Sequence, residues 1–579
     1  MDRVLFAPRA LPPLPPDVAE DPGPYSEWVQ RREQERSRAF VGRSDAEILH
    51  LVMALTGEPP AETVRTLQGL GGQTTGRWTL TVVLHQGWHN AFTTLLAVSG
   101  LARTTQRVRV EAQPDGTSST EMVQAGLRAN EGKDVALIFP GDVWAPDTVA
   151  QLASALSAGG VVYADEDALA ADGAHIAPRL KPAYSPEFLL SSPYMGRPLA
   201  IGSVALAHLL QTEPTAGAPV EHDVALRACE GADNVVHLPE VLSHGAGEDA
   251  GVPLERAAAP TDHIVAALAR RGDVAEVATG PRPGTSRVIR RPRPGITASI
   301  IIPFRDEPRF LRACIDSIDA TRGDQPIELV LVDNGSVQLE TETLLEQLTA
   351  RADVRTLVDD RPFNWARLNN AAAAVATGQV LVFLNNDIEA HRSGWLSALC
   401  AQALRPDVAA VGARLLYPDL RLQHCGVVIG LGGAAGHILV GLEEDRGGYL
   451  NMAVVARECA AVTGACLATR REVFTALHGF DESLGVDLND VDYCLRSQLA
   501  GWRVIVDPSV ELIHHESPSR GTAGAVGDIV HFIDRWKQSI VTGDPFFNRN
   551  LTRVDSSCRL RGPDEKEWWR QWHSTLTSP

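Results

Sequence analysis

The sequence SIIIPFRDE, residues 299–307, begins a series of apolar runs that each end in polar residues. The next two runs are ELVLVDNGS, residues 328–336, and QVLVFLNND, residues 379–387. Short apolar runs bounded by turn residues are typical of buried strands. In an open α/β sheet, polar groups at the carboxyl ends of such strands converge on one crevice, where ligands bind. The stretch therefore predicts an α/β domain with a ligand site at one edge of its sheet.

Two further polar motifs follow in the same half of the chain. The sequence NDVD, residues 489–492, opens a predicted helix, and a later predicted strand ends in His514 and His515. Helix residues i and i+2 lie on different faces, so Asp490 and Asp492 cannot act as a close pair. Successive side chains of a strand point to opposite faces, so we expect only one of the two histidines to reach the site.

These residues resemble the motifs of family 2 glycosyltransferases of the GT-A fold. The resemblance is strongest to the bacterial tandem-domain enzymes of surface-polysaccharide synthesis and to rhamnosyltransferases. Five motifs occur in the order that the family has them, namely Val332–Ser336, Leu384–Asp387, Gly479–Glu482, Asn489–Arg496 and His514–Ser517. Five motifs in order over a single domain make a chance similarity a poor explanation.

The resemblance implies a catalytic base and a metal site. Asp490 stands at the position of the base that takes the acceptor proton. Asp387 is the expected metal ligand, with His514 favoured over His515 as its partner. The implied cofactor is Mg²⁺ or Mn²⁺, because hard divalent ions prefer oxygen ligands and complete their shell with substrate phosphates. Asn385 replaces the usual first Asp of the metal motif, so the protein supplies less negative charge here.

The same resemblance implies the residues that contact the donor and, more weakly, the acceptor. Asp333 is the expected partner of the nucleotide base or ribose, although an Asp in a DNGS turn also acts as a turn cap. For Asn369, contact with the nucleotide and capping of a loop stay equal alternatives. The expected donor-binding residues are Pro303, Phe304, Arg305, Glu307, Asp333, Asn334, Asn369, Asn385 and Asn386, and the expected acceptor residues are Gly464 and His437.

Composition limits the partners and the compartment. The 579 residues carry a formal net charge of -19, which excludes nucleic acid as the main partner because phosphate binding needs a basic face. The eight cysteines form no Cys-x-x-Cys pair, so we expect buried thiols in a reducing cytoplasm. We find neither a leader pattern nor an apolar run near the ~20 residues of a membrane span. The predicted location is the cytoplasm, with at most a peripheral contact at the inner face of the membrane.

The chain divides into five predicted segments. We expect an α/β protein with two tandem GT-A domains (nucleotide-diphospho-sugar transferase, Rossmann-like), the first degenerate, after an N-terminal helical extension. Within the extension, residues 25–55 have helical character and are interpreted as a docking helix pair. The segments are an extension over residues 1–76, proline-rich and then helical; a degenerate GT-A-like domain over 77–280; a Pro/Arg-rich extended linker over 281–295; the catalytic domain over 296–543; and a tail over 544–579.

An internal duplication supports the two-domain prediction. The stretch 222–227 resembles 491–496, and the stretch 139–142 stands where 384–387 stands in the later half. The first half lacks a strand-ending proline and the DNGS turn, which indicates that it has lost its nucleotide pocket. Asp142 is then interpreted as an ordinary loop acid, and the first half as a docking or acceptor-guiding domain.

The sequence therefore predicts an inverting, metal-dependent glycosyltransferase of hexosyl or deoxyhexosyl groups. Its donor is expected to be a UDP-, dTDP- or GDP-linked sugar, and its acceptor a hydroxyl of a growing surface polysaccharide or lipid-linked glycan. The alternative is a non-catalytic scaffold that binds nucleotide or glycan in a polysaccharide assembly complex. A dinucleotide-binding enzyme is excluded because the chain has no Gly-x-Gly-x-x-Gly after a strand.

Overall fold

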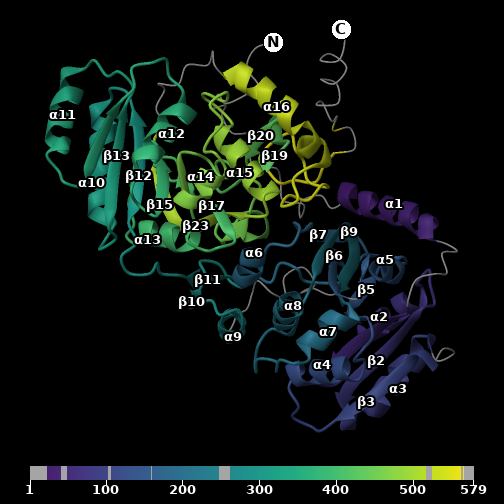
Figure 1. Cartoon of the computed structure of the whole chain (residues 1–579). Coiled ribbons are helices and arrows are strands. Elements are labelled where there is room, and N and C mark those ends of the chain that lie inside the picture. The colour runs from purple at the N-terminus through teal and green to yellow at the C-terminus, as the bar shows by residue number, and fades with distance from the viewer. Residues whose placement is uncertain are drawn as a thin grey trace. The chain divides into compact units, whose positions relative to one another are not determined.

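A computed structural model describes residues 23–40, 48–101, 106–157, 159–246, 261–516, 525–562 and 565 (Figure 1). The chain forms two compact units. Among the described residues, the first unit comprises those from 23 to 185 and from 189 to 286, and the second comprises Pro186–Phe188 and those from Arg287 onward. The predicted proline-rich stretch, up to residue 22, and most of the predicted tail beyond residue 562 lie outside the described residues.

The first unit is built on a mixed sheet with the strand order β3-β2-β1-β4-β8-β6-β9-β5, and β7 pairs with β6. Strand β1 runs parallel to β2 and β4, whereas β8 runs antiparallel to its neighbours. The strands are β1 (Leu49–Leu55), β2 (Trp78–His85), β3 (Val108–Gln113), β4 (Val135–Leu137), β5 (Asp142–Trp144), β6 (Gly160–Leu169), β7 (His175–Arg179), β8 (Leu199–Ile201) and β9 (Asn234–Ala246).

Helices accompany this sheet, and a two-stranded sheet follows it. A capping box starts α4, because Ser118 Oγ accepts from Glu121 N–H while the Glu121 carboxylate accepts from Ser118 N–H. The helices are α1 (Gly23–Phe40), α2 (Thr63–Gly71), α3 (His89–Val98), α4 (Ser119–Arg128), α5 (Thr148–Ala155), α6 (Pro186–Ser191), α7 (Ser203–Leu209), α8 (Val220–Glu230) and α9 (Asp262–Arg270), and the small sheet pairs β10 (Glu276–Thr279) with β11 (Ser286–Ile289).

The second unit repeats the same sheet plan. Its strand order is β14-β13-β12-β15-β22-β17-β23-β16, with β18 paired to β17 and β21 to β23, while β19 and β20 form a separate pair. The strands are β12 (Ala298–Phe304), β13 (Ile327–Asp333), β14 (Val354–Val358), β15 (Val380–Leu384), β16 (Ile388–Ala390), β17 (Val408–Leu416), β18 (Leu422–His424), β19 (Val427–Ile429), β20 (Ala435–His437), β21 (Arg457–Glu458), β22 (Cys466–Arg470) and β23 (Arg503–His514).

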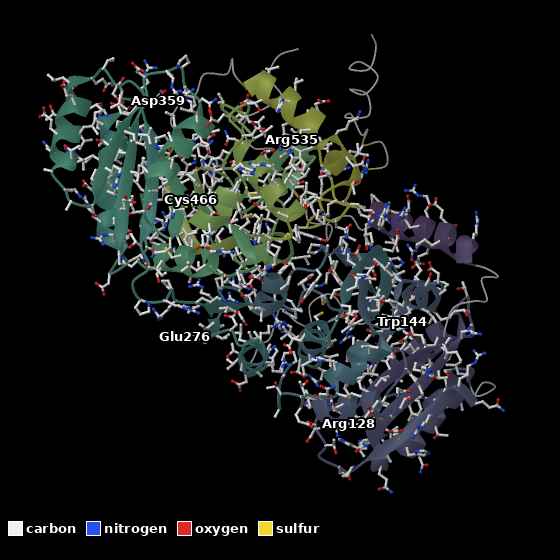
Figure 2. All side chains as sticks on the ribbon, viewed as in Figure 1. Arg128, Trp144, Glu276, Asp359, Cys466 and Arg535 are labelled. Carbon is white, nitrogen blue, oxygen red and sulfur yellow. The ribbon has the colours of Figure 1, made fainter. Side chains whose placement is uncertain are left out.

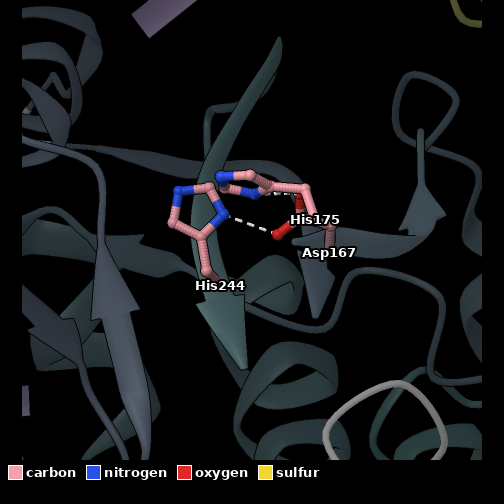
Figure 3. A group of neighbouring side chains, drawn as sticks. All are labelled: Asp167, His175 and His244. Atoms are coloured by element: carbon pink, nitrogen blue, oxygen red, sulfur yellow. Dashed lines mark hydrogen bonds and ion pairs between the residues drawn. The ribbon is translucent and has the colours of Figure 1, made fainter. Parts of the chain in front are cut away.

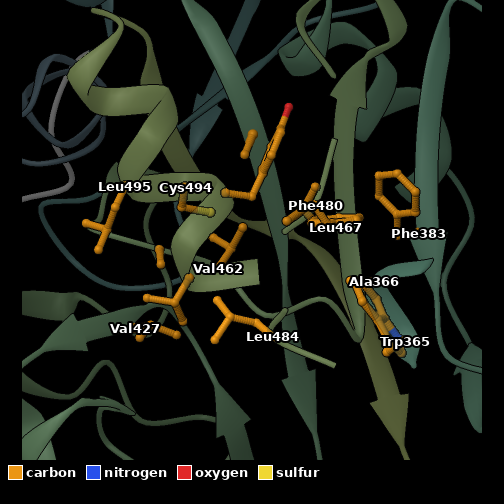
Figure 4. Packing of buried hydrophobic residues seen from close by; sticks show 14 of the residues in the cluster. Trp365, Ala366, Phe383, Val427, Val462, Leu467, Phe480, Leu484, Cys494 and Leu495 are labelled. Atoms are coloured by element: carbon orange, nitrogen blue, oxygen red, sulfur yellow. The ribbon is translucent and has the colours of Figure 1, made fainter. Parts of the chain in front are cut away.

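Helices cover both faces of this second sheet, which explains why every residue of β12 is buried. In α10 the buried residues Leu311, Cys314, Ile315 and Ile318 follow helical spacing. On the other face, Phe480 packs its ring 4.9 Å from that of Trp365 and 4.7 Å from that of Phe383, measured between centroids (Figure 4). The helices are α10 (Pro308–Thr321), α11 (Leu339–Thr349), α12 (Trp365–Val375), α13 (Trp395–Ala403), α14 (Arg471–Ala476), α15 (Asn489–Leu499) and α16 (Ala525–Thr542).

The two sheets confirm the predicted pair of tandem α/β domains, and α1 confirms a helix in the N-terminal extension. The helical interpretation of residues 48–55 is wrong, because Leu49–Leu55 forms the strand β1 within the first sheet. A domain that starts at residue 77, as predicted, would exclude β1 from the sheet to which it belongs. The predicted extended linker, 281–295, contains β11, which is hydrogen-bonded to β10.

Candidate active site

The parallel strands of the second unit bring their carboxyl ends to one edge of the sheet. Phe304 at the end of β12 is in register with Asp333 at the end of β13, and β15 runs parallel beside β12. The Asn334 N–H donates to the Phe304 carbonyl at 2.9 Å, which fixes the turn after β13 against β12. This edge is where the predicted donor-binding residues gather.

Asp387 and His514 meet at this edge. Strand β16 pairs antiparallel with β23 so that Ile388 lies opposite His514. The His514 Nε2 atom lies 3.2 Å from Asp387 Oδ1 and 3.4 Å from Asn385 Nδ2. Asp387, Asn385 and His514 are each at most 7% exposed. The carboxylate and the imidazole therefore share a buried position that an ion could occupy.

Gln423 holds the ring of His514. The His514 Nδ1 atom lies 2.6 Å from Gln423 Oε1, and a carboxamide oxygen can only accept a hydrogen bond. Nδ1 is thus the donor of this hydrogen bond, and Nε2 is directed at Asp387 and Asn385. A hydrogen bond to the far nitrogen is the usual way in which a metal-binding histidine is oriented. Sequence reasoning missed this role of Gln423, which comes from β18.

His515 lies on the other side of β23. Its Nε2 atom lies 2.9 Å from Glu389 Oε1, and its ring packs against Phe310 with centroids 5.5 Å apart. The alternation of side chains along a strand explains why the two histidines have different partners.

Asp490 is fixed at the N-terminus of α15. The Gly464 N–H donates to Asp490 Oδ2 at 2.6 Å, and the Val491 N–H donates to Asp490 Oδ1 at 2.7 Å. A Cβ at Gly464 would lie 2.8 Å from the Trp365 ring, so only glycine allows this approach. The Asn385 N–H donates to the carbonyl of Ala465, the residue after Gly464, at 3.0 Å. Asn385 and Asp490 are thus connected through the backbone of two consecutive residues, Gly464 and Ala465.

Asp492, the second acid of NDVD, has a structural environment. Its side chain is fully buried and accepts from Arg496 Nε at 2.7 Å and from Trp536 Nε1 at 3.0 Å. The Arg496 guanidinium also donates to the carbonyls of Leu477 and Gly479. These contacts attach α15 to α16 and to the loop that precedes α15.

The predicted donor-binding residues have different environments. Asp333 Oδ1 accepts from Ser336 N–H at 2.8 Å, which is the turn cap considered as its alternative role. Asn334 donates from Nδ2 to the carbonyls of Asp359 and Arg361, so its amide braces a loop. Asn369 is fully buried and donates to the Trp365 carbonyl one turn earlier, which gives direct contact with a nucleotide no support.

The remaining predicted donor residues flank this edge. Pro303 and Phe304 are buried, Asn386 is half-buried, and Arg305 and Glu307 are exposed. Glu307 has φ 51°, in the left-handed region, just before Pro308 begins α10.

Asp359 is a second feature that sequence reasoning missed. Its N–H donates to the Asp333 carbonyl, and its carboxylate accepts from the guanidinium groups of Arg361 and Arg367. Asp359 is labelled in Figure 2. The hydrogen bond from Arg361 lowers the pKa of Asp359. The ion pairs fix the loop that follows β14 beside the turn at Asp333.

His437, a predicted acceptor residue, contacts Gln423, the residue that holds the ring of His514. Its Nδ1 donates to the Gln423 carbonyl at 3.1 Å, and its ring lies edge-to-face with that of His424 at 4.6 Å between centroids. Burial lowers the pKa of both His424 and His437. The pair is therefore neutral at physiological pH and suited to packing and hydrogen bonding.

At the corresponding edge of the first unit, the acidic side chains bind the guanidinium of Arg197. Asp142 is followed by Val143, which pairs with His244 on the neighbouring strand. In the same way, Asp387 is followed by Ile388, which pairs with His514. The Arg197 guanidinium donates to Asp142 Oδ1 at 2.8 Å and to Glu221 Oε1 at 3.2 Å. Asp142 is 1% exposed, and burial raises its pKa. The interpretation of Asp142 as an ordinary loop acid is therefore wrong, because it is a buried partner of Arg197.

Comparisons with known proteins support the prediction of the family. Residues 299–477 match the family described as "Glycosyl transferase family 2", so the similarity to this family lies in the second half of the chain. The chain is 33% identical to the "O-antigen biosynthesis protein RfbC" of Myxococcus xanthus over 96% of its own length and 44% of that protein. It therefore spans less than half of this relative.

Two shorter or weaker similarities accompany that match. Over 60 residues, 10% of this chain and 20% of the relative, it is 40% identical to "N-acetylglucosaminyl-diphospho-decaprenol L-rhamnosyltransferase" of Mycobacterium tuberculosis. A solved structure of GalNAc-T7 with UDP, GalNAc and Mn²⁺ aligns with a TM-score of 0.35 and 16% identity, over 48% of this chain and 54% of that one.

Within the described parts of the chain, no helix is both long and apolar enough to span a membrane.

Proposed function

We propose that the family 2 domain of this chain transfers a sugar from a nucleoside diphosphate to a hydroxyl of a growing surface polysaccharide or lipid-linked glycan. The name of the O-antigen relative supports this class of acceptor. The observation that carries the proposal is the connection of Asp387 and His514 to Asp490 through Asn385 and the 464–465 backbone. One buried edge thus combines a pair suited to an ion with a fixed carboxylate.

Asp387 and His514 fit a divalent ion that is shared with the diphosphate. The pair offers one carboxylate oxygen and one imidazole nitrogen, 3.2 Å apart. Mg²⁺ or Mn²⁺ bound by so few protein ligands takes its remaining oxygens from phosphate and water. When bound, the ion neutralises charge on the departing diphosphate. The role of the protein is to hold Asp387 and the Nε2 atom of His514 in place, and Gln423 does this for the imidazole.

Asp490 accepts the proton in the proposed reaction. The acceptor oxygen forms a bond to the anomeric carbon while the bond from that carbon to the diphosphate oxygen breaks. The electron pair of the broken bond leaves with the diphosphate, and the hydroxyl proton passes to the Asp490 carboxylate. A single displacement from the opposite face inverts the anomeric configuration. Two backbone N–H groups hold the carboxylate in one orientation for this step.

Asp333 and Gly464 complete the proposed assignment. Asp333 binds the base or ribose of a UDP-, dTDP- or GDP-linked sugar, since it ends a strand at the same edge. Gly464 and His437 face the acceptor in this proposal, His437 from the segment after β18. The first unit binds no sugar nucleotide in this proposal and acts in docking or in guiding the acceptor. This part of the proposal is supported by the Arg197 guanidinium, which donates to both Asp142 and Glu221.

A donor screen tests the proposal and its rival, a scaffold that binds nucleotide or glycan without turnover. The full chain is freed of metal with a chelator, and UDP-, dTDP- and GDP-sugars are added with and without Mg²⁺ or Mn²⁺. We expect one donor to raise the thermal unfolding temperature and to be hydrolysed slowly, in both cases only with metal. Binding of a donor without hydrolysis, and without transfer to any glycan acceptor, would instead support the scaffold.

A further inference from the structure

Three side chains of the first unit form a cluster that the proposed reaction does not use. Asp167 Oδ2 lies 2.9 Å from His175 Nδ1, and Asp167 Oδ1 lies 2.5 Å from His244 Nδ1 (Figure 3). One ligand atom from each residue lies within 4.8 Å of those of the other two. Among the described residues, this is the one such group of three or more His, Cys, Asp or Glu.

The strands of the first sheet bring the three side chains to one face. Asp167 on β6 is the register partner of His244 on β9. Leu169, two residues after Asp167 and so on the same face, is the partner of His175 on β7. The three residues are 3%, 6% and 3% exposed. Backbone pairing, rather than chance approach of surface side chains, thus assembles a buried group of potential ligands.

The surroundings are those of a site for a transition metal. The far nitrogen of His244, Nε2, lies 2.7 Å from Glu33 Oε1, and a carboxylate in that position commonly orients a metal-binding imidazole. The Tyr25 hydroxyl donates to Asp167 Oδ2 at 2.9 Å.

We propose that Asp167, His175 and His244 bind a zinc-class transition-metal ion. Two imidazoles and one carboxylate suit Zn²⁺, Co²⁺ or Ni²⁺, whereas Mg²⁺ and Mn²⁺ prefer oxygen ligands. Binding displaces the Nδ1 protons that now lie between the rings and Asp167. Both Tyr25 and Glu33 belong to α1, so the ion strengthens the attachment of that helix to the sheet. The site is chemically distinct from the Asp387–His514 pair.

The test measures metal binding rather than sugar transfer, so its result is independent of the proposed function. The full chain carrying Asp387→Ala, which removes the other ion site, is stripped of metal and titrated with Zn²⁺ in a calorimeter. We expect one equivalent to bind. Co²⁺ should give a visible absorption band from imidazole coordination, and Zn²⁺ should slow hydrogen exchange in α1.

His244→Gln and His175→Gln should each weaken Zn²⁺ binding at least tenfold and remove the Co²⁺ band. Two variants guard against loss of folding in one of them, which circular dichroism detects. The matched control is His237→Gln, because His237 also lies on β9 and also pairs with a buried aspartate, Asp165, at 2.7 Å. It should bind Zn²⁺ as the parent does. No Zn²⁺ binding by the parent, or equal losses in control and test variants, would show a cluster held by hydrogen bonds alone.

Discussion

The two α/β units share one strand order and differ in what lies at the carboxyl edge of the sheet. In the second unit, His514 directs Nε2 at Asp387, and Gln423 holds its other nitrogen. In the first unit, the corresponding His244 is held on one nitrogen by Asp167 and on the other by Glu33 of α1. The fold supplies a histidine to this edge in both units, but its partners are two carboxylates in the first unit and Gln423 and Asp387 in the second.

The acids at this edge differ in the same way. Asp142 and Glu221, at the start of β5 and on α8, share the guanidinium of Arg197. Asp387 and Asp490, at the corresponding places in the second unit, face an imidazole and a backbone N–H. The cationic side chain of Arg197 joins the first pair, whereas in the proposed function the second pair accepts an ion and a proton. A shared strand order is therefore not enough to make a site.

The largest expected effect comes from the base position. Asp490→Asn should reduce sugar transfer on the order of 10²- to 10⁴-fold, since an amide cannot accept the acceptor proton. Donor affinity, measured by calorimetry, should change little because the base acts on the acceptor. Glu221→Gln, the matched change in the first unit, should leave transfer unchanged. Unchanged turnover in Asp490→Asn would remove Asp490 from the mechanism.

The next effect concerns the ion. Asp387→Ala should weaken Mn²⁺ and donor binding together, by more than the roughly 10- to 100-fold that loss of an outer partner of a metal site costs. The ion and the diphosphate hold each other, so titrating either one in the presence of the other should show the loss. Full metal-dependent activity in this variant would place the ion elsewhere.

A smaller effect is expected at Gln423. Gln423→Leu leaves His514 Nδ1 without its acceptor, and we expect the Mn²⁺ concentration for half-maximal activity to rise roughly 10- to 100-fold. Gln423→Glu keeps an acceptor at this place and should restore most of the affinity. A change in kcat without any change in the metal dependence would contradict this positioning role.

The smallest effect on activity is predicted for the first unit. Asp142→Ala should leave donor turnover near that of the parent, while loss of the buried ion pair should cost about 1–3 kcal/mol of stability. Arg197 keeps Glu221 as a partner, so we expect the low end of this range. Thermal unfolding of the full chain and a donor assay measure the two quantities. A fall in turnover at unchanged stability would reveal a second working site.

Much of the second unit could be predicted from local sequence. The apolar runs before Asp333 and Asn385 form β13 and β15, and α10 has the buried face that its spacing predicts. Strand alternation predicted that His514 and His515 would face different ways, as their separate partners show. In these cases a few neighbouring residues decide the geometry, because side-chain direction follows from the backbone period.

Tertiary structure alone decided the rest. The run Leu49–Leu55 has no pattern that separates a strand from a helix, and pairing with β2 and β4 makes it the strand β1. The contacts of Glu33 with His244 and of Gln423 with His514 join residues 211 and 91 positions apart. Sequence motifs determined which residues stand at the carboxyl edge of each sheet. Packing of distant elements determined the partner of each acid and histidine, because a hydrogen bond or ion pair depends on distances that local sequence does not encode.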